Sequence, residues 1–275
     1  MLEIPEAVVT AGQMAATLRG RTVASVVAAH TPHRFAFFNG DPDSYDGVLR
    51  GQVLADARAV GGMVEILLGG TSLLVNDGVN LRCHEPGAVT PRKHQLLVGF
   101  SDGSTLSATV RMYGSLLCYP TGTCDNPYYA VALAKPSPLT AAFDAAHFDA
   151  LLAPAEVQKL SIKAALATEQ RIPGLGNGVL QDILWTARLH PRRKVSTLDR
   201  AEVVRLHATI VELLATMAAM GGRDTESDLF GQPGGYQTVM SRLHVGEPCP
   251  ACGTPRVKEA FLGGSVHYCP GCQQL

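Results

Sequence analysis

The sequence predicts an α+β protein in which a β-rich N-terminal half precedes a helical half and a short cysteine-rich end. Three observations predict this order. Short β-rich segments separated by turn residues fill residues 22–119, amphipathic helical patterns fill residues 140–220, and two Cys-x-x-Cys pairs follow within residues 249–272. A chain of 275 residues is long enough for two domains.

The chain begins with a predicted helix. Pro5 suits the first helical position, and the carboxylate of Glu6 complements the positive end of the helix dipole. Apolar residues recur up to Leu18, and Gly20 ends the pattern. On local sequence alone, Glu3 and Glu6 are simply carboxylates at the start of a helix.

Residues 22–119 predict a β-sandwich. Segments 22–29 and 35–38 are rich in residues that favour strands. Further along, apolar segments lie on either side of Gly69-Gly70 and of Asp102-Gly103, which is typical of β-hairpins. Many short strands joined by tight turns are typical of a sandwich.

The second half of the chain predicts helices behind a hinge. Prolines interrupt residues 121–139, which we interpret as the hinge. Amphipathic patterns predict one helix over 156–169 and a longer one over 199–220, and residues 222–237 form a polar, glycine-rich loop. The predicted units are a β-sandwich at 1–120, the hinge at 121–139, a helical domain at 140–244 and a cysteine-rich unit at 245–275.

The turn and helix within residues 170–191 predict an anion-binding site. Pro173 and Gly176 bound a tight turn, and Asn177 suits the N-cap of the helix that follows. The first N–H groups of a helix point outward, and its aligned dipoles place partial positive charge there. The anion we expect is a DNA phosphate, although an ordinary corner between two helices would show the same pattern.

Composition restricts where nucleic acid could bind. Lysine plus arginine nearly cancels aspartate plus glutamate, so the formal net charge is −1 and a DNA contact needs a local patch. Arg188, Arg192, Arg193 and Lys194 could form one, or could be the solvated end of a helix. Since no apolar run is long enough to cross a bilayer and no signal-peptide layout opens the chain, we expect a cytoplasmic protein.

Four cysteines carry the clearest chemistry in the chain. Cys249 and Cys252 form one Cys-x-x-Cys pair, and Cys269 and Cys272 form a second after sixteen residues. This spacing is typical of tetrahedral thiolate zinc, with a redox pair or free thiols as the alternative. Four thiolates leave no open coordination position, so we predict one structural Zn²⁺ in a zinc ribbon.

The two helices, the glycine turn and Asn177 resemble the helix-two-turn-helix of the formamidopyrimidine-DNA glycosylase and endonuclease VIII family. The resemblance extends to both ends of the chain, where Glu3, Pro5 and Glu6 match the family's N-terminal pattern and the four cysteines match its zinc finger. It implies a base-excision-repair protein, a monomer, that binds damaged or distorted double-stranded DNA. It also implies catalytic carboxylates at Glu3 and Glu6 and a lesion-capping loop at residues 222–237.

The resemblance further implies which residues contact DNA. In the family, the residues matching Lys163 and Asn177 hold the phosphates around the damaged nucleotide. Side chains matching Met112 and Tyr113 fill the gap left by the extruded base, although both could equally be core residues here. The full set of expected DNA contacts is Lys93, Met112, Tyr113, Lys163, Arg171, Gly176 and Asn177.

Three family positions hold different residues in this chain. Leu2 stands where the family has an N-terminal proline whose amine attacks the sugar C1′ and forms a Schiff base. Gly62 stands where a lysine grips phosphate, and Ser265 where an arginine contacts phosphate. If Met1 stays, the free amine lies about 3–4 Å further along the chain, which is enough to spoil a near-attack geometry.

Three functions are therefore compatible with the sequence. A DNA glycosylase would hydrolyse the N-glycosidic bond with Glu3 as general acid or base and Glu6 ordering the water, without an imine and so without the usual AP-lyase activity. A catalytically inactive protein would only read damaged or distorted DNA. A zinc-ribbon adaptor would bind another protein. We favour the glycosylase over the reader, and both over the adaptor.

Overall fold

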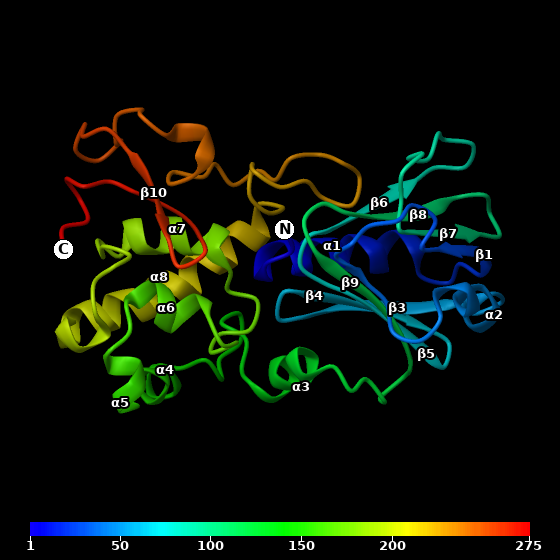
Figure 1. Ribbon diagram of the computed structural model, residues 1–275, viewed down its shortest axis with the longest axis horizontal. Helices are drawn as coiled ribbons and strands as arrows, with labels where there is room; N and C mark the ends of the chain where they lie inside the picture. The colour runs from blue at the N-terminus through cyan, green and yellow to red at the C-terminus, as the bar shows by residue number, and fades with distance from the viewer.

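The computed structural model describes all 275 residues and has two lobes that lie side by side along its longest axis (Figure 1). The β-rich lobe is formed by the N-terminal part of the chain, and the helical lobe carries the C-terminal hairpin. The N-terminus lies between the lobes. None of the helices combines the length and the apolar character needed to span a membrane.

The predicted N-terminal helix is α1 (Ile4–Leu18), and it belongs to both lobes. Ala7, Met14 and Leu18 are buried in the core of the β-rich lobe, whereas Ile4 is buried in the core of the helical lobe. The first turn of α1, with Glu6 on it, therefore lies at the junction of the two lobes.

The β-rich lobe is a sandwich of two sheets, as predicted. One sheet has the order β1-β7-β8-β6, and the other has the order β2-β9-β5-β4-β3. Both predicted hairpins are present, because β4 pairs with β5 and β7 pairs with β8 in antiparallel register. The strands are β1 (Val23–Ala28), β2 (Ala36–Phe37), β3 (Leu54–Val60), β4 (Met63–Leu68), β5 (Thr71–Val75), β6 (Val79–His84), β7 (Leu96–Phe100), β8 (Thr105–Val110) and β9 (Gly114–Pro120).

Part of the segment interpreted as a hinge is a helix, α3 (Pro127–Ala134). The side chain of Asn126 caps it by accepting from the amides of Tyr128 and Tyr129. Tyr129 and Ala132 pack against a sandwich cluster that includes Leu117 of β9. This stretch is therefore anchored to the sandwich, while the predicted domain boundaries stay predictions.

In the helical lobe, the helix predicted over 156–169 is wrong, because the chain breaks at residues 159–161. The amides of Ile162 and Lys163 donate to the carbonyls of Arg193 and Pro191, and the Val195 amide donates to the Leu160 carbonyl, so this stretch pairs with the segment before α8 instead of continuing a helix.

The remaining helices are α2 (Tyr45–Leu49) in the sandwich lobe, then α4 (Ala145–Leu152), α5 (Ala155–Gln158), α6 (Ile162–Ala167), α7 (Asn177–Thr186) and α8 (Arg200–Ala219), with 3-10 turns η1 (Pro42–Ser44), η2 (Val195–Thr197) and η3 (Arg242–His244).

The long helix predicted near the end of the helical region is α8. It begins at a capping box, in which the Asp199 side chain accepts from the Glu202 amide and the Glu202 side chain accepts from the Asp199 amide. Leu206, Ile210 and Leu214 are fully buried, so the apolar face of α8 forms the floor of the helical core.

The C-terminal unit is an antiparallel hairpin, β10 (Val257–Phe261) and β11 (Gly264–Tyr268), which lies against α7 (Figure 1). Gln181 of α7 joins the two, since its Oε1 accepts from the His267 amide and its Nε2 donates to the Ser265 carbonyl. The hairpin is thus held at the N-terminal half of α7.

Candidate nucleic-acid interface and active site

Glu3 closes the start of α7. Its Oε1 accepts from the Gly178 amide at 2.8 Å and its Oε2 from the Val179 amide at 2.7 Å. The N-cap predicted at Asn177 is wrong, because Gly176 holds that position and a carboxylate from the other end of the chain takes the free amides. A Cβ on Gly176 would lie 2.5 Å from Glu3 Oε1, so the approach requires glycine. Glu3 is thus the anion that the Gly178 and Val179 amides hold, and the phosphate expected at the turn around Gly176 and Asn177 stays a prediction.

Arg223 is buried between Glu3 and Glu6. Its Nε and Nη2 donate to the two oxygens of Glu6 at 2.9 and 2.8 Å, and its Nη1 lies 3.4 Å from Glu3 Oε2. Burial raises the pKa of Glu3, and Arg223 with the α7 amides acts in the opposite direction. Arg223 makes two hydrogen bonds to Glu6 and only a longer contact with Glu3, so its charge offsets the burial of Glu3 only in part.

Sequence reasoning missed Arg223. It lies in the glycine-rich loop 222–237, and an arginine in a polar loop carries no local signal of burial. Only the fold shows that this loop packs onto the first turn of α1, with Arg223 just 2% exposed. The loop therefore supplies the cation that holds the predicted catalytic carboxylates.

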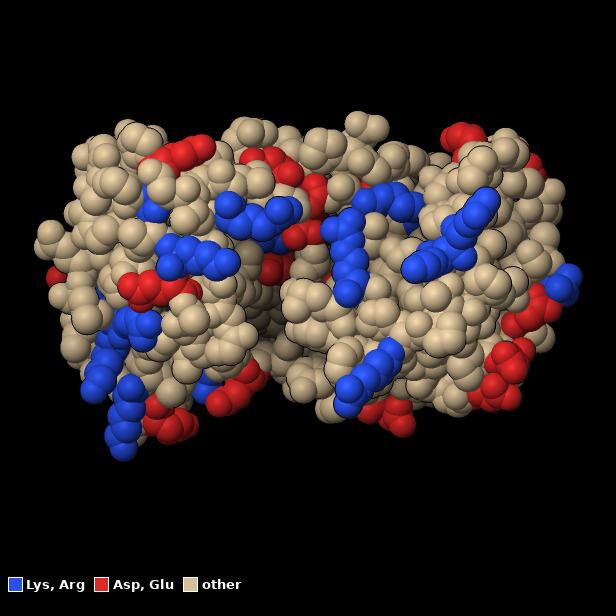
Figure 2. All heavy atoms as spheres, turned by 45° about the horizontal axis from the view of Figure 1, so that its top comes forward, with Lys and Arg blue, Asp and Glu red and all other residues tan.

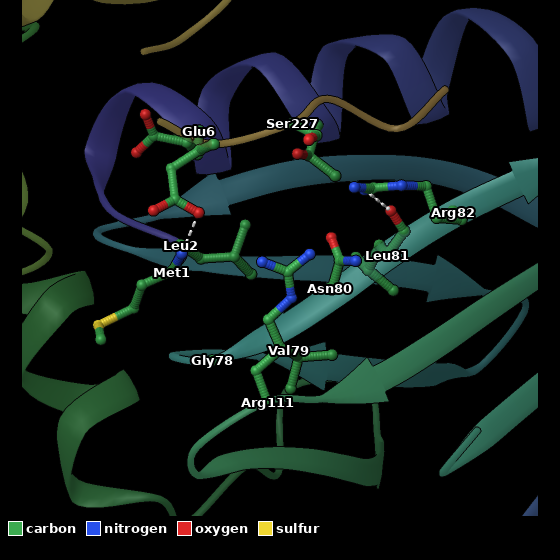
Figure 3. Close-up of a pocket in the computed structure, with 12 residues that line it drawn as sticks. Met1, Leu2, Glu6, Gly78, Val79, Asn80, Leu81, Arg82, Arg111 and Ser227 are labelled. Carbon is green, nitrogen blue, oxygen red and sulfur yellow. Dashed lines mark hydrogen bonds and ion pairs between the residues drawn. The ribbon is translucent and has the colours of Figure 1, made fainter. Parts of the chain in front are cut away.

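A small cavity of about 30 Å³ lies beside the N-terminus (Figure 3). The Met1 amine donates to Glu226 Oε2, and the Leu2 amide donates to the Asp77 carbonyl at 2.7 Å. Figure 3 shows Arg111 extending from below toward Met1 and Leu2. The cavity has room for about two water molecules, so in this state it is too small for a nucleobase.

Lys163 and Asn177 both contact the C-terminal hairpin. Lys163 Nζ donates to the Phe261 carbonyl at 2.6 Å, and Asn177 Nδ2 donates to the Ser265 carbonyl at 2.8 Å. A Cβ on Gly264 would lie 3.6 Å from Lys163 Nζ and 3.9 Å from Asn177 Nδ2. The residue that faces this pair is therefore Gly264, whereas Ser265 contacts Asn177 through its backbone carbonyl.

Gly62 lies where the two lobes touch. A Cβ on Gly62 would lie 3.0 Å from Gly174 Cα and 3.2 Å from the Leu2 carbonyl, so the backbones of two glycine turns are in contact. The Ile4 amide also donates to the Gly174 carbonyl at 3.0 Å. The glycine turn at 173–176 thus fixes the start of α1. It contributes no cation where the two lobes touch.

The other predicted contacts divide into two groups. Met112 and Tyr113 are 62% and 43% exposed, so the alternative that they are core residues is wrong. Lys93 is exposed before β7. Arg171 is largely buried, where it donates to the Ala164 carbonyl and pairs with Glu169, so it supports the end of α6, and its contact with DNA stays a prediction.

The basic residues predicted after α7 are mostly engaged by neighbours. Arg193 pairs with Glu202, and Arg192 pairs with Glu259 at 3.2 Å while its guanidinium stacks on Phe261 at 4.1 Å. On the molecule as a whole, Figure 2 shows Lys and Arg side chains on both lobes, on either side of a central hollow. This local distribution is what a DNA contact requires of a chain with almost no net charge.

The four predicted zinc ligands come together. Their Sγ atoms lie within 4.8 Å of one another, with Cys249–Cys272 at 3.7 Å and Cys252–Cys269 at 3.4 Å. A tetrahedral ion with Zn–S bonds of about 2.3 Å requires sulfur separations of about 3.8 Å, so the donor set fits.

The chain matches known proteins over its whole length. Residues 135–228 match the family model described as the formamidopyrimidine-DNA glycosylase H2TH domain, and residues 246–275 match the zinc finger found in FPG and IleRS. A formamidopyrimidine-DNA glycosylase of Symbiobacterium thermophilum is 32% identical over 284 residues, which cover 100% of this chain and 90% of that protein. This chain belongs to the formamidopyrimidine-DNA glycosylase family.

Further relatives agree with this membership. A formamidopyrimidine-DNA glycosylase of Enterococcus faecalis is 28% identical over 85% of this chain and 84% of its own. The structure of Lactococcus lactis Fpg in complex with abasic-site DNA matches with a TM-score of 0.84 and 25% identity, covering 99% of this chain and 100% of that one. The MutM (Fpg) protein of Thermus thermophilus matches with a TM-score of 0.81 and 27% identity, covering 98% of both chains.

Family membership confirms three predictions. The fold class, the helix-two-turn-helix and the C-terminal zinc finger are those of the formamidopyrimidine-DNA glycosylase family. The four cysteines of this family member hold one structural Zn²⁺, which supports the hairpin that contacts Lys163 and Asn177. The chain is thus a DNA-repair glycosylase by family, with its own arrangement around Glu3.

Proposed function

We propose that this protein binds damaged or distorted double-stranded DNA across the junction of its lobes and hydrolyses the N-glycosidic bond of a damaged base. The observation that carries the proposal is the position of the Glu3 carboxylate, which lies at that junction on the first turn of α7. Asn177, with which α7 begins, matches the position for which the family resemblance implies phosphate binding. The DNA-bound Lactococcus lactis Fpg, which shares the fold, supports DNA as the partner.

A phosphate has a suitable seat at Lys163 and Asn177. Their amino and amide groups now donate to two backbone carbonyls of the zinc hairpin, and a phosphate oxygen is a stronger acceptor than either. Gly264 has no side chain, so only backbone of the hairpin stands against the pair at this point, and because Lys163 is 4% exposed a phosphate has to take the place of the hairpin carbonyls. We propose that a backbone phosphate binds the pair in this way and that the zinc hairpin fixes its orientation.

Glu3 supplies the acid–base chemistry in this proposal. A carboxyl whose pKa burial raises can donate a proton to the sugar ring oxygen, or can accept one from the water that attacks C1′. Glu6 takes part less directly, since both of its oxygens accept from Arg223. Its predicted role in ordering the water stays a prediction.

A hydrolytic route agrees with the start of the chain. The Leu2 nitrogen is an amide that donates to the Asp77 carbonyl, and the Met1 amine is paired with Glu226. Neither nitrogen is a free amine held beside Glu3. We therefore propose hydrolysis without a Schiff base and without AP-lyase activity, with Met112 and Tyr113 filling the gap left by the extruded base.

A non-catalytic reader of damaged DNA is the second candidate. It is favoured by the bonding of Glu3, whose two oxygens both accept from α7 amides and which is only 3% exposed. In that case Glu3 is a structural cap between the lobes. The lesion that the protein recognises and its strand preference would then be measured by DNA binding alone.

Base release separates the two candidates. The native protein and Glu3→Gln are incubated with duplexes that each carry one damaged base, and released base and duplex binding are measured on the same panel. Excision that Glu3→Gln abolishes, with duplex binding retained, supports the glycosylase. Glu212→Gln, an exposed position on α8, is the control that should keep full activity.

The remaining outcomes contradict the proposal in different ways. Duplex binding with no excision from any lesion identifies a reader. No duplex binding at low salt removes both candidates and favours a protein-binding zinc ribbon. A borohydride-trapped covalent adduct on damaged DNA would show that an amine nucleophile operates after all.

A further inference from the structure

Four of the five exposed aromatic side chains lie at one edge of the sandwich. Phe35, Phe37, Tyr113 and Tyr128 are 46%, 49%, 43% and 57% exposed, and only Phe230 lies in another segment. We call these four residues the aromatic edge. Exposed aromatic side chains that gather in one place are typical of a binding surface, because each costs free energy when left in water.

Strand register brings the members of the aromatic edge together. β2 runs parallel to β9 with Ala36 opposite Gly114, and the Phe35 carbonyl accepts from the Gly114 amide at 3.0 Å. Since side chains alternate along a strand, Phe35, Phe37 and Tyr113 point to the same face of the sheet. The intervening Ala36 and Phe38 pack against the sandwich core instead.

Tyr128 extends the same face onto α3. Its neighbour Tyr129 packs in one cluster with Leu117 of β9. Side chains alternate along a strand, so Leu117 lies on the same side of the sheet as Ser115 and as Tyr113, which directly precedes β9. Figure 1 shows α3 beside the sheet that contains β9. The aromatic edge therefore runs from β2 across the start of β9 to α3.

Cationic side chains lie around Phe35 and Phe37, whereas the acidic neighbours Asp77 and Glu3 lie at the Tyr113 end of the aromatic edge. The Arg34 guanidinium lies 5.2 Å from the centre of the Phe35 ring. Residues 28–38, 88–95 and 111–116 contain no acidic residue, and their charged residues are Arg34, Arg92, Lys93 and Arg111. The first two segments are joined by hydrogen bonds from the Ala29 and Thr31 amides to the Gln95 and His94 carbonyls.

We propose that the aromatic edge binds unpaired nucleotides of a DNA strand, with bases stacked on Phe35 and Phe37 and phosphates held by Arg34 and its cationic neighbours. Every base offers a face to an aromatic ring, but only an unpaired base can leave its own stack to do so. The site adjoins the proposed duplex interface at Tyr113. The proposal rests on the proposed function, because it assumes that DNA is the partner.

Charge favours DNA over protein as the occupant. A guanidinium over an exposed ring, beside segments that contain no acidic residue, suits a polyanion that carries aromatic bases. Binding of unpaired nucleotides at the aromatic edge implies that this protein prefers duplexes that adjoin single-stranded DNA, such as a bubble or a tailed end, over fully paired duplexes.

The test compares three labelled DNAs of common sequence by fluorescence anisotropy: a blunt duplex, the duplex with a single-stranded tail on either strand, and the duplex with a central unpaired bubble. The protein variants are the native chain, the double variant Phe35→Ala/Phe37→Ala, and the control Val204→Ala, an exposed apolar position on α8. Zinc content and thermal melting verify that each variant is folded.

We expect the native protein and Val204→Ala to bind tailed or bubble DNA more tightly than blunt duplex. The double variant should lose about tenfold or more of its affinity for the DNAs with unpaired bases and stay within about twofold on blunt duplex. Equal affinities for all three DNAs, or a double variant that weakens all three alike, would overturn this inference and leave the proposed function intact.

Two other results would also overturn the inference. If the native protein binds no DNA at low salt, the proposed function fails together with it. If the native protein sediments as a dimer and the double variant as a monomer, with DNA affinities unchanged, the aromatic edge is a contact between two copies of the chain.

Discussion

Glu3 and Gly178 are joined by a hydrogen bond of 2.8 Å although they lie 175 positions apart in the chain. The bond connects the segment that leads into α1 with the first turn of α7, so the predicted catalytic carboxylate is also a helix cap. Val179 makes the matching bond to the second oxygen at 2.7 Å. The catalytic and the structural role of Glu3 therefore have to be measured separately.

Replacing Glu3 with alanine should destabilise the protein even in the absence of DNA. The variant leaves two amides of α7 without an acceptor and removes one anion beside Arg223, and the loss of a charged cap of this kind costs about 1–3 kcal/mol. Urea denaturation of Glu3→Ala and of the exposed control Glu212→Ala measures the difference. Equal stability of the two variants would show that the carboxylate does not support α7 in solution.

Stability should depend on pH through Glu3 in a defined direction. Burial raises its pKa above the ordinary value of 4.5, so the folded state holds the proton more tightly than the unfolded chain. The contribution of Glu3 to the free energy of unfolding is thus fully present below pH 4.5 and is lost as the pH rises through the folded-state pKa.

The comparison that isolates this effect is the native protein against Glu3→Gln, by urea denaturation from about pH 4 to about pH 8. The advantage of the native protein over the variant should be largest at the acid end and should decline as pH rises. An advantage that grows with pH would mean that Arg223 and the α7 amides outweigh burial.

Arginine at position 264 should strengthen duplex binding. Gly264 is exposed and a Cβ there would make only ordinary contacts with Lys163 and Asn177, so we expect an arginine to be accommodated and to add a cation at the proposed phosphate seat. Gly264→Arg should raise the affinity for duplex DNA several-fold at low salt. It should also steepen the salt dependence of that affinity by the amount expected for about one additional phosphate contact.

The neighbouring variant Ser265→Arg is the matched control, because its side chain leaves β11 on the opposite face. It adds the same charge without facing Lys163 and should change affinity much less. A similar gain from both variants would indicate a general charge effect and no specific seat at position 264.

Removal of zinc should weaken DNA binding without unfolding the sandwich. The four cysteines fix the hairpin whose Phe261 and Ser265 carbonyls hold Lys163 and Asn177. Treatment with a chelator, or Cys272→Ser, should abolish the bound zinc, lower the melting temperature of the helical lobe and reduce duplex affinity. Restored binding after zinc is added back to the chelated protein is the control, and unchanged binding by zinc-free protein would contradict the proposed phosphate seat.

The sequence by itself determined the features whose signals are local. The two-residue turn at Asp102-Gly103 fixes its hairpin, the Asp199–Glu202 capping box begins α8, and the spacing of the four cysteines predicts the zinc site. The resemblance of both chain ends and of the helix pair to a known family predicted the fold class, which the relatives confirm. In each case the interacting residues are close in the chain or follow a fixed spacing.

Only the tertiary structure decided how the carboxylates at the lobe junction are held. Arg223 reaches Glu6 across 217 positions, and Glu3 takes the cap of α7 that local sequence assigned to Asn177. The break before α6 likewise follows from pairing with residues 191–195, and the position that faces Lys163 is fixed by the register of the zinc hairpin. A local pattern records the preferences of neighbouring residues, whereas the partner of a buried charge is set by packing, which brings distant segments together and requires each desolvated charge to be compensated.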